Sequence, residues 1–181
     1  SDIRGVDPAG NPLDVAVDWK GALHATSVLY VTPFVIVPGI AAADALDAND
    51  ALGTTGTFQF DVSGKVLPER GYIVAASLLD PDDDTLSATM HLFTRPFVAA
   101  ASDAAFTISA ADSRNWVESI PFPTSTDIGA AKVSRVTGLN VPFYLPNRIF
   151  YWQFSTTGTP TIAAGLMPEV RLYIIAFEAP R

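Results

Sequence analysis

The sequence predicts an all-β protein, an antiparallel β-sandwich of jelly-roll-like form. Short alternating or fully apolar segments recur from Val28 onward, and most of them are bounded by Gly, Pro, Asn or Asp. The 14 prolines lie mainly at these borders, which suits strand ends and sheet edges and argues against long helices. With 181 residues, of which 49% are hydrophobic, the chain is long enough to bury one sizeable core.

The first 27 residues are predicted to form an N-terminal arm in front of a sandwich domain at residues 28–181. Apolar and polar residues alternate from Leu13 to Trp19, which indicates a half-buried strand. A reversal at Lys20-Gly21 and a short return over Ala22 to Ala25 would complete a hairpin. The arm packs either on its own sheet edge or on a neighbouring subunit. In the second case its interface residues are Ile3, Val6, Pro8, Leu13, Val15, Val17 and Trp19.

The sandwich strands follow from β-rich composition between turn residues. Ile40 to Leu52 is predicted to hold one helical turn at most. Ser109, followed three residues later by Asp112, resembles a capping box and predicts a short helix or 3-10 turn that places Trp116 on the sheet. Strands are expected at Leu29–Val37, Thr57–Val62, Tyr72–Leu79, Leu86–Phe93, Lys132–Val136, Val141–Leu145, Ile149–Phe154, Thr161–Ala163 and Val170–Phe177.

Charge and composition exclude several classes of function. The net charge is −8 and no basic run occurs, so the chain lacks the cations that nucleic-acid binding requires. No apolar run approaches the length that spans a bilayer, and no membrane partner is expected. Cysteine is absent, and the two histidines, His24 and His91, stand in no recognisable triad pattern. We therefore expect no enzyme and no cofactor, and a structural role for His91.

Two clusters allow further hypotheses. The acidic run around Asp82 is interpreted as a solvated hairpin tip between two strands, and the alternative is a calcium loop formed by Asp80, Asp82 and Asp84. Tyr151 and Trp152 could form an exposed aromatic surface for carbohydrate. Both faces of their strand are apolar, however, which favours a sheet that is buried on both sides or shared with another subunit.

The order of segments resembles a family of tailed-bacteriophage virion proteins that includes capsid decoration proteins. The resemblance runs over about Ala48 to Phe177 and includes a Tyr-Ile-Ile-Ala strand near the C-terminus. The segments that carry the resemblance are the arm Asp2 to Pro12, the Ala-Asn-Asp-Ala-Leu-Gly approach at Ala48–Gly53, Ile73–Asp80, Thr89–Phe93 and Ala104–Asp112.

This resemblance implies a viral structural protein, a capsid decoration or cement protein on the outer surface of the phage head. It implies the major capsid protein as partner and a homotrimer as the assembly. The alternative is a tail-associated module for host recognition or carbohydrate binding. Strands available for pairing and a broad apolar surface, as this composition predicts, suit either role.

Overall fold

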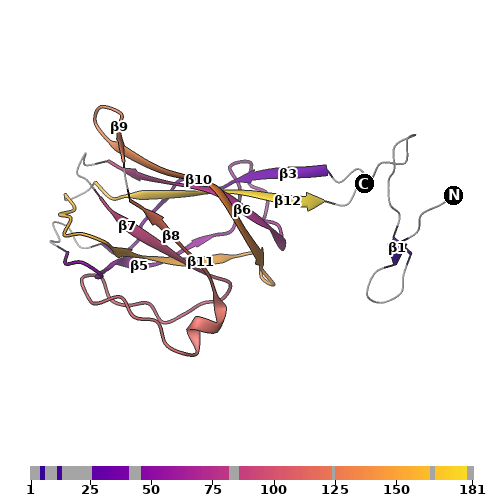
Figure 1. Ribbon diagram of the computed structural model, residues 1–181, viewed down its shortest axis with the longest axis horizontal. Coiled ribbons are helices and arrows are strands. Elements are labelled where there is room, and N and C mark those ends of the chain that lie inside the picture. The colour runs from indigo at the N-terminus through magenta and orange to yellow at the C-terminus, as the bar shows by residue number, and fades with distance from the viewer. Residues whose placement is uncertain are drawn as a thin grey trace.

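The computed structural model describes residues 5–6, 12–13, 26–40, 46–81, 86–123, 125–163 and 166–178. Two antiparallel sheets pack face to face in these ranges (Figure 1). The strands are β1 (Gly5–Val6), β2 (Pro12–Leu13), β3 (Thr26–Val31), β4 (Val35–Ile36), β5 (Ala51–Phe58), β6 (Arg70–Asp80), β7 (Ala88–Phe93), β8 (Trp116–Phe122), β9 (Thr126–Asp127), β10 (Lys132–Tyr144), β11 (Phe150–Thr156) and β12 (Glu169–Glu178), with the 3-10 helix η1 (Asp112–Asn115) before β8.

The predicted jelly-roll-like sandwich is confirmed by the connectivity of its eight main strands. One sheet has the order β3-β12-β6-β10-β9, with β4 also on β12, and the other has the order β5-β11-β7-β8. The first main strand therefore pairs with the eighth, the second with the seventh, the third with the sixth and the fourth with the fifth. This is the pairing of one long hairpin folded over into two layers, which is the jelly-roll arrangement.

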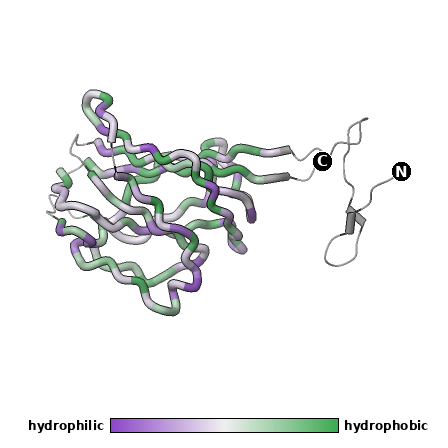
Figure 2. The backbone as a smooth tube through the Cα atoms, in the orientation of Figure 1, coloured by the Kyte–Doolittle hydropathy of each residue, from purple (hydrophilic) through white to green (hydrophobic). Residues whose placement is uncertain are grey.

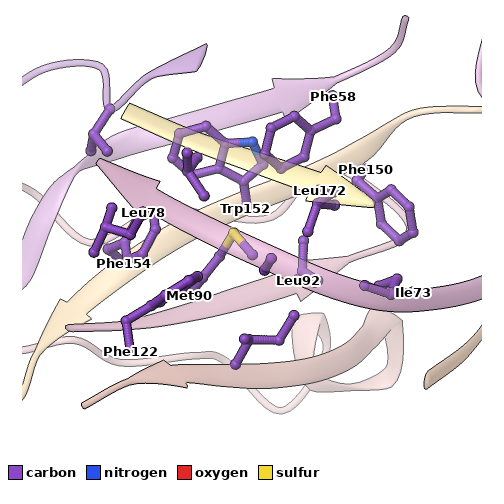
Figure 3. Packing of buried hydrophobic residues seen from close by; sticks show 14 of the residues in the cluster. Phe58, Ile73, Leu78, Met90, Leu92, Phe122, Phe150, Trp152, Phe154 and Leu172 are labelled. Atoms are coloured by element: carbon purple, nitrogen blue, oxygen red, sulfur yellow. The ribbon is translucent and has the colours of Figure 1, made fainter. Parts of the chain in front are cut away.

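The core lies between the two layers and is rich in aromatic side chains (Figure 3). Trp152 is fully buried and stacks on Phe58, with the ring centroids 5.4 Å apart. Gly56 lies directly under the indole, since a Cβ at this position would be 2.2 Å from Trp152 Cζ2. In Figure 2, hydrophobic residues lie along the strands of both layers, as expected for sheets that face one core.

Several element boundaries differ from those predicted. The strand expected at Leu29–Val37 is divided into β3 and β4 around Pro33, which has no N–H to donate to a neighbouring strand. Just before it, Thr32 is buried and its Oγ1 accepts a hydrogen bond from the Leu172 N–H at 2.9 Å. The two strands expected on either side of Gly138 form one strand, β10, whose register shifts at this left-handed glycine (φ 73°). The strand expected at Thr161–Ala163 is not one of the named strands, and β3 begins two residues before the predicted domain boundary.

The predicted 3-10 turn is present as η1, but its N-cap is Ala111 and not Ser109, which instead contacts Asp112, the first residue of the turn. The Ser109 hydroxyl accepts a hydrogen bond from the Asp112 N–H at 3.0 Å and lies 2.7 Å from Asp112 Oδ2. Trp116 is the first residue of β8; its side chain is 46% exposed, and its indole N–H donates to Ser119 Oγ of the same strand at 3.2 Å.

Candidate functional site: two contrasting sheet faces

The outer face of the four-stranded sheet is covered by the chain's own connection between β7 and β8, residues 94–115. In Figure 1 this connection runs beneath the lower layer and ends in η1. It is attached to the edge of β5, where the Ala51 N–H donates to the Ala104 carbonyl at 2.8 Å and the Asp103 N–H donates to the Ala51 carbonyl at 3.1 Å. The interpretation of Ile149–Phe154 as a strand buried on both sides is therefore confirmed for its central part.

Gln153 is the main polar link beneath this connection, and it is fully buried. Its Oε1 accepts the Ala100 N–H at 3.1 Å, and its Nε2 donates to the carbonyls of Ala100 at 2.7 Å and of Gly53 at 2.8 Å. Gly53 adopts a left-handed conformation (φ 69°), and a Cβ there would be 2.3 Å from the Pro38 carbonyl oxygen. One buried amide thus joins β11, β5 and the covering segment.

His91 is the most chemically suggestive residue of this face. Its Nδ1 lies 2.8 Å from Ser119 Oγ on β8, and its Nε2 lies 2.9 Å from Ser155 Oγ on β11. The ring stacks on Phe106 of the covering segment, with centroids 4.1 Å apart. Burial lowers the pKa of His91 to about 4, so the imidazole is neutral at pH 7.

These contacts indicate a structural role for His91, which links strands and the covering segment. Both ring nitrogens are occupied by serine hydroxyls, and one ring face is covered by Phe106. The Trp116 indole N–H also donates to Ser119 Oγ at 3.2 Å, so that hydroxyl already accepts one hydrogen bond. A nucleophile and base pair requires access for a substrate and a third group that orients the base. Here the imidazole instead joins three strands and anchors the segment that covers them.

The prediction that Trp152 belongs to an exposed aromatic surface is wrong. Its side chain is 0% exposed in the core, and its indole N–H has no hydrogen-bond partner among the described residues. Tyr151, which points to the opposite face, is half-buried. The two residues therefore cannot form one carbohydrate platform, because neighbouring residues of a strand point to opposite sides.

The acidic run is not a hairpin tip, because β6 and β7 on either side of it belong to different sheets. Asp80 is also buried, not solvated, and its Oδ2 accepts the Leu86 N–H at 3.2 Å. Asp82 and Asp84 lie outside the described residues. Among the residues that are described, no group of three or more His, Asp or Glu side chains could hold a metal ion.

The predicted arm is described only at its two short strands. β1 pairs with β2, with Gly5 opposite Leu13 and Val6 opposite Pro12. The hairpin expected beyond Leu13 lies outside the described residues, as do Ile3, Pro8, Val15, Val17, Trp19 and His24.

The outer face of the six-stranded sheet carries no covering segment from the described parts of the chain. Leu29, Ile175, Tyr72 and Pro142 are consecutive register partners and form one row across β3, β12, β6 and β10. Leu29 is 58% exposed and Tyr72 is 37% exposed, whereas the next residues along their strands, Tyr30 and Ile73, are buried in the core. Next to this row, an open hollow of about 320 Å³ is lined by Tyr72, Val74, Asn140 and Ile175.

Fold and surface together define a jelly-roll domain in which one sheet face is covered by residues 94–115 and the other is not covered by any segment that the structure describes. Comparison with protein-family models, with curated proteins and with solved structures finds no match to this chain. In the described part of the chain, no helix has the length and apolar character needed to cross a membrane. The chemistry of the uncovered face is therefore the strongest guide to function.

Proposed function

We propose that this chain is a virion structural protein of the capsid decoration or cement type, which binds the major capsid protein through the uncovered face of its six-stranded sheet. The observation that carries the proposal is the apolar row of Leu29, Ile175 and Tyr72 on a jelly-roll sheet. Viral capsid domains and lectins use this architecture, but a fold alone does not define a function.

The exposed row has the composition of an interaction surface. Aliphatic and aromatic side chains are enriched at the centre of protein interfaces, and contiguous exposed apolar patches mark such sites. The contrast within one molecule supports this interpretation, because residues 94–115 cover one sheet face, whereas no described segment covers the apolar row of the other face. A homotrimer would place three such faces on a shell at a position of threefold symmetry.

The number of copies in a particle tests the proposal. Particles banded from a lysate of the source culture should contain this protein in numbers on the order of hundreds, because a shell repeats its surface lattice many times. Quantitative mass spectrometry against the major capsid protein measures this number. About a dozen copies would instead favour the tail-associated alternative. Absence of the protein from the particles would contradict both roles.

The arm provides a second test. Deleting residues 1–25 should leave the sandwich folded, because the described pairing of β3 with β12 begins at Thr26. If the arm reaches a neighbouring subunit or the capsid, the shortened protein no longer assembles or binds particles. Trp19→Ala should then weaken association by about 2 kcal/mol, since tryptophan is enriched among the residues that dominate interfaces. Co-sedimentation with particles and far-UV circular dichroism measure the two effects. Unchanged binding of both variants would assign the contact to the sheet face alone.

A further inference from the structure

Two arginines on the outer face of the six-stranded sheet have no carboxylate partner among the described residues. Arg171 of β12 and Arg135 of β10 are both register partners of Ser77 of β6, so they flank one residue on the outer face. Two strand spacings separate their Cα atoms by roughly 10 Å. Within the described parts of the chain, neither guanidinium forms an ion pair with a carboxylate. This is unexpected in a protein with 19 acidic and 11 basic residues.

Aromatic rings hold both guanidinium groups in place. The Arg171 guanidinium carbon lies 4.0 Å from the centroid of the Phe34 ring, and that of Arg135 lies 5.0 Å from the centroid of the Tyr173 ring. The Tyr173 hydroxyl hydrogen-bonds with the side chains of Ser77 and Arg171. A guanidinium that is stacked in this way keeps its in-plane N–H groups for a ligand, and it loses less conformational entropy on binding.

The positive charge of this cluster affects the pKa of the Tyr173 hydroxyl. Partial burial by itself raises the pKa of Tyr173. The hydrogen bonds with Ser77 and Arg171 and the charges of Arg135 and Arg171 outweigh that effect, so the pKa of Tyr173 lies below its ordinary value. The cluster therefore already favours negative charge at its centre.

We propose that Arg135 and Arg171, with Ser77 and Tyr173 between them, form a carboxylate-binding site that receives an acidic side chain of the protein partner. This step rests on the proposed structural function. Arginine binds carboxylates through paired N–H groups in a fixed plane, which suits recognition of an acidic side chain. Charge complementarity therefore selects a partner surface with an exposed Asp or Glu.

The neighbouring apolar row defines the rest of that partner surface. Ile175 and Arg171 lie four residues apart on the same side of β12, which corresponds to roughly 13 Å along the strand. The partner should therefore present apolar side chains at about this distance from its carboxylate. An apolar centre with a charged pair beside it is the usual composition of a specific interface.

A peptide titration tests the site without particles. A hexaglutamate peptide is titrated into the purified full chain by isothermal titration calorimetry, with a hexaglutamine peptide as the uncharged reference. The glutamate peptide should bind and the glutamine peptide should not. Arg135→Gln should weaken binding by at least about tenfold, because a charge-assisted hydrogen bond is lost. Arg114→Gln, which removes the same charge from the exposed helix η1, should leave the affinity unchanged.

Spectroscopy of Tyr173 gives a second measurement. A bound carboxylate partly neutralises the two guanidiniums, so the peptide should raise the pKa of the Tyr173 phenol, as followed by ultraviolet absorbance difference against Tyr173→Phe. Arg135 is exposed, so its replacement should not disturb folding. Arg171→Gln, which also removes the stack on Phe34, is used only if circular dichroism shows a native fold.

Several results would overturn the carboxylate site. The first is equal binding of the hexaglutamate peptide by wild type and Arg135→Gln. The second is a loss of affinity with Arg114→Gln as large as that with Arg135→Gln. The third is tighter binding of inorganic phosphate than of the peptide. Free glutamate that binds as tightly as the peptide would assign the site to a small molecule and overturn the protein partner. If the purified protein does not bind the peptide but particles contain hundreds of copies of it, only the carboxylate site is rejected. Peptide binding by a protein that is absent from particles would reject the virion role alone.

Discussion

Replacing Trp152 with alanine is expected to lower the free energy of unfolding by about 4 kcal/mol, because the change removes a fully buried indole and leaves a cavity. The loss also includes the stack on Phe58 and the edge contact with Phe154, whose ring centroid lies 5.6 Å from that of Trp152. Gly56 has no side chain that could fill the space. Urea unfolding followed by far-UV circular dichroism measures the change.

Two further variants show whether core packing is the cause. Tyr151→Ala removes a half-buried ring from the opposite face of the same strand and should cost less than about 2 kcal/mol. Trp152→Phe should fall between the two, because phenylalanine keeps most of the apolar volume and removes an indole N–H that is buried without a hydrogen-bond partner. Equal costs for Trp152→Ala and Tyr151→Ala would contradict the packing described here.

The fold class was predictable because jelly-roll strands leave a strong local pattern. β6 and β12 appear in the sequence as long apolar segments between turn residues, and their observed bounds extend the predicted ones by no more than two residues at either end. The beginning of β5 was missed because Gly53 and Gly56 weaken the strand signal. Both glycines are required by tertiary contacts, with Pro38 and with Trp152 respectively. Strand β8 was not among the predicted strands, because the short turn predicted at Ser109 left the apolar residues after it unassigned.

The candidate sites were less predictable than the fold, because they depend on contacts between distant strands. The sequence gives no sign that Ser119 and Ser155 meet His91, since these residues lie 28 and 64 positions away. The pairing of Arg135 and Arg171 across Ser77 likewise requires the order of β12, β6 and β10, which a local pattern does not contain. Trp152 was considered for an exposed aromatic surface because of its neighbour Tyr151, whereas the two apolar faces of their strand already favoured burial or a shared face; only the position of residues 94–115 shows that the chain itself covers the outer face.

Acidification from pH 6.5 to pH 4 is expected to destabilise the protein through His91. The pKa of His91 is about 4 in the folded protein and 6.5 in the unfolded chain, so in this interval the unfolded state binds a proton that the folded state does not. Stability therefore falls as the pH is lowered. The shift corresponds to a loss of about 2–3 kcal/mol after allowance for the partial exposure of the ring. Below pH 4 this group adds no further loss, because both states are then protonated.

The matched variant His91→Gln isolates this effect from the carboxylates, which titrate in the same range. Glutamine keeps a donor and an acceptor for Ser119 and Ser155 but cannot take up a proton. The difference in the free energy of unfolding between wild type and His91→Gln, measured by urea unfolding at several pH values, should shrink as the pH falls from 6.5 to 4 and remain constant above 7. His24→Gln serves as the control for general histidine titration. If the difference does not change with pH, the imidazole is not held neutral by the fold, and the covering segment at Phe106 must be more open to water than the contact with His91 implies.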